Sequence, residues 1–193
     1  MSRRPVIAIV GDAGITPGSV TYDAARDTGR AAVDNGYRIV TGGLTGVMEA
    51  ASRGAHESGS YREGDTVGIL PNDDPGAANA WVDIAIPTGM SHARNAIVAN
   101  ADALIAIGGR AGTLSEIAFA WTLRRLVVAL DSTGWAEKLA GAPLDDRPRY
   151  SDLPDDQIFR ALTPEEAIIQ INERLPRYSK WGRSFQTGFH GSG

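Results

Sequence analysis

The sequence predicts an α/β protein, a three-layer, Rossmann-like, doubly wound sheet of about six or seven mainly parallel strands. Strand-like and helix-like segments alternate along the chain, which is the pattern of parallel strands joined by crossover helices. Two strand-like runs end in glycine-rich turns that open helices. The 193 residues suffice for one domain with a full core but not comfortably for two. We expect one ligand-binding domain over residues 1–176 and a polar, flexible tail over 177–193.

Six apolar runs of strand length define the expected sheet, and each is bounded by glycine, proline or polar residues. In chain order they are VIAIVG (6–11), YRIVTGG (37–43), TVGILP (66–71), WVDIAIP (81–87), DALIAIGG (102–109) and RLVVAL (125–130). The first run follows two arginines but ends in Gly11-Asp12 and not in a cleavage-site pattern. We therefore interpret it as a buried strand and not as a signal peptide.

Helices are predicted where small and apolar residues recur at spacings of three and four. Those between the strands are Thr21–Asp34, Val47–His56, Ser91–Asn100 and a helix that follows Gly112. A last helix begins at Thr163, Pro164 and Glu166, which form a capping box with proline in the first turn. Residues 141–157 are rich in Asp, Pro and Arg, so we expect them to form a surface loop.

Composition excludes several classes of function. The chain has no cysteine, so disulfides, thiolate catalysis and thiolate metal sites are excluded, and its three scattered histidines lack metal-ligand spacing. A net charge of −4 without a basic face argues against nucleic acid, and no apolar run is long enough to span a membrane. Without an export signal, the cytoplasm is the expected location. Lys138 and Lys180 are the only lysines, and both lie outside the glycine-rich segments, which argues against a pyridoxal-phosphate enzyme.

The two glycine-rich turns are TGGLTGVMEAA (41–51) and GGRAGTLSE (108–116). In a parallel sheet both lie at the carboxyl edge, where the free N–H groups of a helix N-terminus hold phosphates and carboxylates. Arg110 adds a positive charge, and the Thr113 hydroxyl is expected at the helix N-cap. Neither turn matches the Walker or dinucleotide fingerprint. Glycine is also common in such turns for steric reasons alone, but two turns with an arginine favour a phosphate-type ligand.

Arg94 and Glu116 flank the fifth strand. Taken singly, each residue has an ordinary structural explanation. A glutamate in the first turn of a helix, such as Glu116, interacts favourably with the helix dipole, and an arginine on a crossover helix, such as Arg94, is a solvated charge. Taken with the two turns, they would bracket one pocket, with Arg94 on a phosphate and Glu116 facing a sugar or ring. His92 is interpreted as a surface or packing histidine and not as a base. Asp12, after the first strand, could approach the same edge of the sheet, but it is interpreted as an exposed loop aspartate.

Five segments follow one another in the first 130 residues, namely GGLTGVMEAASRGA, GILP, ANAWVDIAIPTGM, ARNAIVANADALIAIGG and AGTLSEIAFAW. In this ordered set the sequence resembles the LOG-like (lysine-decarboxylase-like, or SLOG) Rossmann family. That family contains phosphoribohydrolases of cytokinin riboside monophosphates and molybdenum-cofactor carrier proteins. The TGM…ARN and GTLSEIA segments look more like the carrier-type branch, whose members bind the cofactor or an anion without catalysis.

The hydrolase branch is marked by P-G-G-x-G-T-x-x-E and an upstream arginine. The positions that match are Arg94, Gly109, Gly112, Thr113 and Glu116. The chain departs from the motif at three positions. Gly108 stands in place of the proline, Arg110 replaces the second glycine, and Asn95 stands where the hydrolases usually have lysine. Because these departures fall on the phosphate loop, the resemblance favours a binding protein over a hydrolase.

The resemblance therefore implies a carrier-like protein that binds a phosphorylated small molecule, either molybdenum cofactor as cargo or a purine nucleotide. The alternative is a phosphoribohydrolase that cleaves the N-glycosidic bond of a nucleoside 5′-monophosphate, with Arg94 and Glu116 as the catalytic pair, and a nucleotide sensor is a third, weaker option. No metal site and no certain resident cofactor are expected. The expected ligand-binding residues are Gly11, Gly42, Gly43, Thr45, Gly46, Thr88, Gly89, Asn95, Gly108, Gly109, Arg110, Ala111, Gly112 and Thr113.

The resemblance also implies a homodimer or higher homo-oligomer. The helix after Gly112 allows one, because it carries two apolar stripes. The first consists of Leu114, Ile117, Ala118 and Trp121, and the second consists of Phe119 and Leu123. A helix that is apolar on two sides is buried on two sides, by a partner copy or beneath the C-terminal segment.

Overall fold

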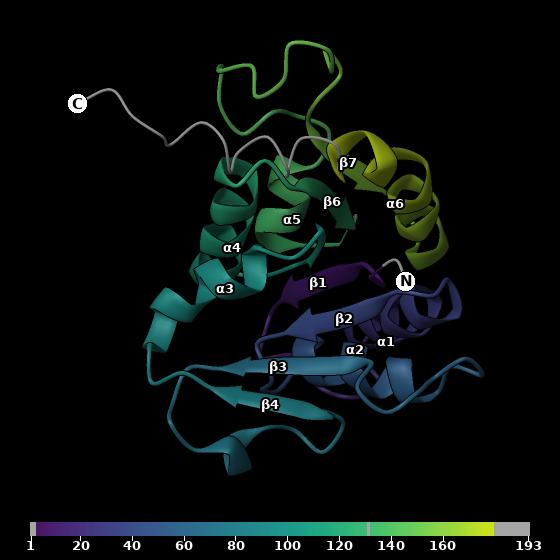
Figure 1. The fold of residues 1–193 in the computed structure, drawn as a ribbon, viewed down its shortest axis with the longest axis vertical. Coiled ribbons are helices and arrows are strands. Elements are labelled where there is room, and N and C mark those ends of the chain that lie inside the picture. Colours follow the sequence, from purple (N-terminus) through teal and green to yellow (C-terminus); the bar gives the residue numbers. More distant parts are fainter. Residues whose placement is uncertain (1–2, 131, 180–193) are drawn as a thin grey trace.

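The computed structural model describes residues 3–130 and 132–179. Within them, seven parallel strands form one sheet in the order β4-β3-β2-β1-β5-β6-β7, with β4 and β7 at its two edges (Figure 1). The strands are β1 (Val6–Gly11), β2 (Arg38–Thr41), β3 (Thr66–Leu70), β4 (Ile84–Pro87), β5 (Ala103–Ile107), β6 (Leu126–Leu130) and β7 (Ile158–Ala161). The predicted doubly wound α/β fold is confirmed.

The helices are α1 (Val20–Asp34), α2 (Val47–His56), α3 (Asn95–Ala99), α4 (Ala111–Thr122), α5 (Gly134–Leu139) and α6 (Pro164–Ser179). Two 3₁₀ turns, η1 (Pro75–Ala77) and η2 (Ser91–Arg94), complete the described part of the chain. Helices α1, α2 and α6 pack on one face of the sheet, and α3, α4 and α5 belong to the other. None of the described helices is both long and apolar enough to cross a membrane.

Alternation along β1 shows how the sequence produces the two faces. Ile7 and Ile9 point into the core beneath α1 and α2, whereas Ala8 and Val10 point into the core beneath α3 and α4. All four side chains are at most 1% exposed, because the central strands of a doubly wound sheet are covered on both sides. This is why the strand is an unbroken apolar run in the sequence.

Several element predictions need correction. The helix predicted over Ser91–Asn100 is divided into η2 and α3, and Ser91 has a φ of +51°, which breaks regular α-helix at its start. The fourth strand is only Ile84–Pro87, because Trp81 belongs to a turn and Asp83 to a bend. The short elements η1, α5 and β7 were not predicted, since three to six residues carry too little periodicity.

The C-terminal part of the chain follows the prediction at its start. The Glu166 amide donates to the Thr163 hydroxyl at 3.2 Å, while the Glu166 carboxylate accepts from the Leu162 amide at 2.8 Å and so reaches one residue beyond the usual capping box. Helix α6 continues through Pro176 to Ser179. The predicted tail therefore begins inside this helix, and its remaining residues, 180–193, lie outside the described residues.

Candidate functional site

The site lies where the strand order reverses. The chain builds β1 to β4 toward one edge of the sheet and then crosses back to place β5 on the other side of β1. In open parallel sheets the crevice at such a switch point, at the carboxyl ends of the strands, is where ligands bind. The turns after β1, β2 and β5 meet there, and the loop from β4 brings in η2.

These segments enclose a cavity of about 400 Å³. Both glycine-rich turns contribute to it, together with the β1–α1 turn and the residues around Arg94. Its lining residues are Val10, Gly11, Asp12, Ala13, Gly14, Gly42, Leu44, Met48, His92, Arg94, Asn95, Arg110, Gly112, Thr113 and Glu116. The structure therefore brings together two turns that lie more than 60 residues apart in the sequence.

A larger cavity of about 520 Å³ lies at the opposite edge of the sheet, near the starts of β1, β2 and β3. Its principal charges are already engaged, since Arg3 and Asp102 form a hydrogen-bonded ion pair and Arg125 donates to Asn100. We place the candidate site in the smaller cavity because the N-terminal amides of α4 and a buried, unpaired arginine face it.

Arg94 is that arginine. It is the last residue of η2 and is only 8% exposed, yet its Nε and Nη1 atoms have no hydrogen-bond partner among the described residues. Burial lowers the pKa of Arg94, and the nearby Glu116 carboxylate partly offsets this. The guanidinium lies directly over the Cα atom of Gly42, where any side chain would fill its place. A buried cation with free N–H groups is a binding group for an acceptor that the protein itself does not supply.

Glu116 faces the same cavity from α4 and is 7% exposed. Burial raises its pKa to about 7, although attraction to Arg94 acts in the opposite direction. Its carboxylate forms no ion pair with Arg94 among the described residues, although the two charges attract each other and both residues line the cavity. A carboxylic acid near neutrality donates or accepts a hydrogen bond according to its partner.

The start of α4 corrects two expectations. The helix begins at Ala111 with Arg110 as its N-cap, so Thr113 is the third residue of the helix and not its cap. Glu116 then lies in the second turn, where the dipole argument for a first-turn carboxylate no longer applies. Arg110 lies beside Asp12, with Nε 3.6 Å from Oδ2, and its side chain is 87% exposed at the mouth of the cavity.

Comparisons with known proteins show the family to which this chain belongs. The model of the SLOG cluster4 family matches residues 4–168. This chain is a member of the SLOG cluster4 family. An uncharacterized protein of Archaeoglobus fulgidus is 42% identical over 111 residues, which cover 57% of this chain and 70% of that relative. The resemblance inferred from the motifs is confirmed.

Two solved structures are similar over almost the whole chain. The molybdenum cofactor binding protein from the phototrophic bacterium Rippkaea orientalis is 32% identical, with a TM-score of 0.72 over 90% of this chain and 98% of that one. The Moco carrier protein from Chlamydomonas reinhardtii is 29% identical, with a TM-score of 0.72 over 91% of this chain and 99% of that one. The SLOG fold and the similarity to the carrier branch therefore rest on sequence and on structure.

Half of the expected site residues line the cavity between β1, β2 and β5. These are Gly11, Gly42, Arg94, Asn95, Arg110, Gly112, Thr113 and Glu116. The others lie in the same turns, or in the loop between β4 and η2, without lining it, and they are Gly43, Thr45, Gly46, Thr88, Gly89, Gly108, Gly109 and Ala111. Two of these have hydroxyls that already bond main-chain carbonyls, since Thr45 donates to Ala13 and Thr88 donates to Leu70.

Close packing explains several of the glycines. A Cβ atom at Gly11 would lie 2.2 Å from the Ile107 carbonyl oxygen, so this glycine lets β1 approach β5. Gly46 has a φ of +69° and presses against the main chain of Asp12. Gly109 has a φ of +93° and leaves no room beside Thr113. These residues shape the turns by allowing close approach of the backbone.

The cavity also contains residues that sequence reasoning had set aside. Asp12 and His92 line it although they were interpreted as an exposed loop aspartate and as a surface or packing histidine. Leu44 and Met48 give it an apolar wall. Asp12 follows the first strand directly, so the rule that ligands bind beyond the carboxyl ends of strands was the signal that points to it. Asn95 lines the cavity and ties α3 to α4 by donating to the Ser115 hydroxyl at 2.8 Å.

Proposed function

We propose that this protein binds a phosphorylated small molecule, molybdenum cofactor or a purine nucleotide, in the cavity between β1, β2 and β5. The observation that carries this proposal is the buried guanidinium of Arg94, whose Nε and Nη1 lack partners among the described residues. A buried charge is costly without hydrogen bonds, so an anionic ligand that accepts from Arg94 would stabilise the site.

The N-terminus of α4 supplies the second half of the phosphate site. The first amides of a helix have no carbonyl partner within the helix and carry a partial positive charge. Helix α4 begins at Ala111 at the edge of the cavity, and Gly112 and Thr113 line it. Exposed Arg110 at the mouth would attract the anion, and buried Arg94 would hold it.

The rest of the cavity suits the ring of such a ligand. Val10, Leu44 and Met48 offer apolar contact, while Asp12 and Glu116 offer carboxyl groups for ring N–H or sugar hydroxyl groups. The names of the two similar structures, a molybdenum cofactor binding protein and a Moco carrier protein, support cofactor as cargo held without turnover.

One observation favours the hydrolase alternative. Burial raises the pKa of Glu116 to about 7, which is the range in which a carboxyl group serves best as a general acid or base. In that reaction Arg94 would hold the phosphate of a nucleoside 5′-monophosphate, and Glu116 would hydrogen-bond the ribose and stabilise the developing positive charge.

A single pair of assays separates the two functions. Protein purified from a host that makes molybdenum cofactor is denatured, and the released small molecules are identified by mass spectrometry. The same protein at high concentration is incubated with AMP, and free adenine is measured. A retained pterin or nucleotide without adenine release is the expected result. Adenine release that is lost in Glu116→Gln would establish the hydrolase, and neither ligand nor turnover would refute both.

We also propose that a second copy of the chain covers the outer side of α3 and α4. Phe119 and Leu123, the second predicted stripe, are 40% and 37% exposed, and Ile97 on α3 is 44% exposed. Large exposed apolar side chains on adjacent helices are typical of interfaces. Sedimentation equilibrium of the parent chain and of Phe119→Asp is the test, with dissociation expected in the variant.

A further inference from the structure

The segment Asn79–Asp83 lies in the motif ANAWVDIAIPTGM but does not line the cavity. Its first residue nevertheless reaches the site. The Asn79 amide nitrogen Nδ2 donates to the carbonyls of Gly43 at 3.1 Å and Leu44 at 2.8 Å, and the Asn79 backbone N–H donates to Gly43 at 2.9 Å. Asn79 Oδ1 accepts from the Trp81 amide at 3.1 Å. Each polar atom of this side chain therefore has a partner.

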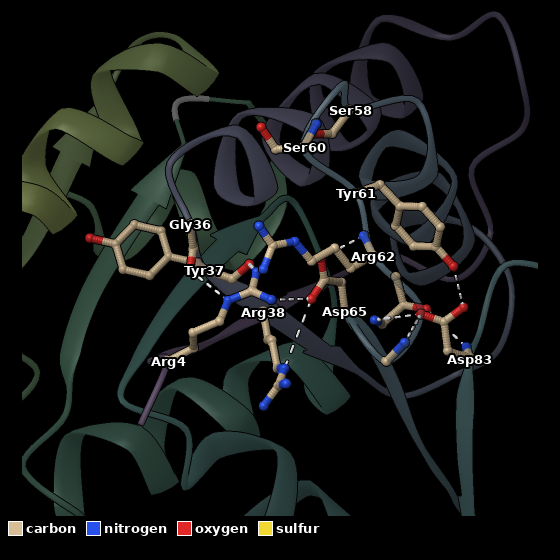
Figure 2. A network of polar contacts seen from close by, with 12 residues as sticks. Arg4, Gly36, Tyr37, Arg38, Ser58, Ser60, Tyr61, Arg62, Asp65 and Asp83 are labelled. Carbon is tan, nitrogen blue, oxygen red and sulfur yellow. Dashed lines mark hydrogen bonds and ion pairs between the residues drawn. The ribbon is translucent and has the colours of Figure 1, made fainter. Parts of the chain in front are cut away.

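The other end of the segment is anchored near the end of α2. Asp83 accepts from the Tyr61 hydroxyl at 2.7 Å and from the amides of Gly64 and Thr66, as Figure 2 shows for Tyr61 and Asp83. Burial alone would raise the pKa of Asp83, but the hydrogen bonds from Tyr61 and Thr66 lower it below its ordinary value. Asp83 is thus a charged, multiply bonded anchor.

The same network continues through the loop before β3. Asp65 accepts from Arg4 and from the Arg62 amide, and Arg38 approaches it from β2 (Figure 2). The loop that holds Asp83 is therefore itself tied to β2 and to Arg4, which precedes β1.

The segment between these anchors runs beside α2. The ring of His56, the last residue of α2, stacks on Tyr61 and meets Trp81 edge to face, and its Nε2 lies 3.2 Å from Asp83 Oδ1. Arg53, one turn earlier, lies over the Trp81 ring at 5.8 Å. Asn79 contacts the turn that precedes α2, so residues 79–83 span this helix from before its start to its end.

That turn carries two parts of the site. Leu44 lines the cavity, and Gly42 lies against the guanidinium of Arg94. A shift of the Gly42–Leu44 main chain would therefore change both the apolar wall and the support of the buried arginine. The two side-chain hydrogen bonds from Asn79 resist such a shift.

We propose that Asn79 is a positioning residue, which holds the Gly42–Leu44 turn in the shape that presents Arg94 to the phosphate of the ligand. The inference rests on the proposed function and adds to it a residue outside the cavity. It assigns the ANAWVDIAIPTGM motif a role in binding through the turn, without contact between Asn79 and the ligand.

The experiment compares Asn79→Asp and Asn79→Ser with the parent chain. Asn79→Asp keeps the acceptor for the Trp81 amide but loses both N–H donors to the turn. Asn79→Ser removes the two amide N–H donors without adding a charge, and its hydroxyl is too short to reach both carbonyls. Because both hydrogen bonds to the turn are lost and the turn is held less firmly, AMP binding by calorimetry should be roughly tenfold weaker in both variants. Hydrogen exchange should accelerate at the amides of Gly43 and Val47, which donate to Thr41 Oγ1 and the Asp12 carbonyl.

Asn35→Asp and Asn35→Ser are the matched controls. The Asn35 side chain also donates to a main-chain carbonyl, that of Ala31, but at the end of α1 away from the cavity. These controls should lower the melting temperature without changing AMP affinity. Parental AMP affinity in both Asn79 variants, or unchanged exchange at Gly43 and Val47, would overturn the positioning role.

Failure of the proposed function is separately visible. If the parent chain binds no AMP and retains no pterin, the binding proposal fails, and hydrogen exchange alone decides whether Asn79 holds the turn. If the parent retains a pterin but does not bind AMP, the amount of pterin retained by each variant replaces AMP affinity as the measurement.

Discussion

Arg94 and Arg149 are equally buried, each 8% exposed, but they differ in their partners. Arg149 forms a two-pronged pair with Asp156 at 2.7 and 2.6 Å and donates to the carbonyls of Trp121 and Arg125. Its guanidinium also lies 3.6 Å from the centre of the Trp121 ring. Arg94 has two buried nitrogen atoms without any partner in the described part of the chain.

This difference separates a structural arginine from a binding one. For Arg149, hydrogen bonds within the protein replace those to water that are lost on burial. The residue can therefore attach a polar loop to α4. For Arg94, the replacement must come from outside, and the cavity beside it has room for a ligand. Although the two arginines are equally buried, Arg149 is thus expected to stabilise the fold and Arg94 is not. The variants described below measure these two contributions.

Arg149→Met should produce the largest effect on folding. It leaves Asp156, whose side chain is 7% exposed, as a buried carboxylate without its ion pair, although the Tyr178 hydroxyl still donates to it at 2.6 Å. Breaking a buried pair in this way costs about 3–5 kcal/mol. Urea denaturation should show this loss in the free energy of unfolding. The control is Arg30→Met, whose pair with Asp27 is exposed and should cost less than about 1 kcal/mol. An equal loss of unfolding free energy in Arg149→Met and Arg30→Met would contradict a special structural role for Arg149.

Glu116→Gln tests the second charge of the cavity through the pH dependence of stability. The pKa of Glu116 is raised from 4.5 to about 7 by burial, so the folded state holds a proton that the unfolded state releases between these values. The stability from this proton is fully present below about pH 4.5 and is lost as pH rises through 7. At high pH the folded state then contains a buried carboxylate.

The variant lacks this ionisation, so its stability relative to the parent should rise between pH 4 and pH 8, by up to about 3 kcal/mol. Urea denaturation across this range measures the change. Glu165→Gln, at an exposed position of α6, controls for the loss of a charge. A difference between parent and Glu116→Gln that is constant with pH would mean that folding does not raise the pKa of Glu116.

Arg94→Met should weaken the binding of AMP by about 2 kcal/mol, roughly thirtyfold, because hydrogen bonds to a charged group are worth about 1.5–3 kcal/mol. The free energy of unfolding should stay constant or rise, by about 1 kcal/mol at most, since the substitution removes a buried charge without partners. Calorimetry at pH 6 measures affinity. Arg110→Met at the exposed mouth should cost less than about fivefold. A marked loss of stability in Arg94→Met would give this arginine a structural role.

The sequence predicts the sheet well because its central strands are buried on both faces. Such strands are continuous apolar runs, and β1 and α2 were predicted with their bounds as the structure has them. The last strand, β7, escaped prediction because Ile158–Ala161 is short and contains an arginine. The loop over residues 141–157 is mostly exposed as expected, but Arg149 and Tyr150 within it are buried by contacts that leave no periodic signal.

The sequence predicts part of the site, because the order of the strands determines which residues meet at the edge of the sheet. Arg94 and Glu116 flank one strand, so topology alone brings them to one edge of the sheet, and the structure places both at the cavity. Glu116 was assigned to the first turn because Thr113 resembles an N-cap, whereas α4 begins two residues earlier, at Ala111. Asn79 bonds carbonyls 35 and 36 residues away, and a single amide in a loop gives no pattern from which this could be read.

Gly11 and Gly42 give the finest test of the difference between a structural role and a role in binding. Neither glycine has a positive φ, and a side chain at each would meet a different kind of atom. A Cβ atom at Gly11 would lie 2.2 Å from the main-chain oxygen of Ile107, which cannot move without disturbing the sheet. Gly11→Ala should therefore lower the free energy of unfolding by about 1–3 kcal/mol.

A Cβ atom at Gly42 would instead lie 2.1 Å from Nη1 of Arg94, the mobile end of a long side chain. Gly42→Ala should leave stability within about 0.5 kcal/mol of the parent, but the displaced guanidinium should bind AMP about tenfold more weakly. Calorimetry and urea denaturation on both variants separate the two effects. If Gly42→Ala lost stability as Gly11→Ala does while keeping its affinity, Gly42 would serve the packing of the turn and not the placement of Arg94.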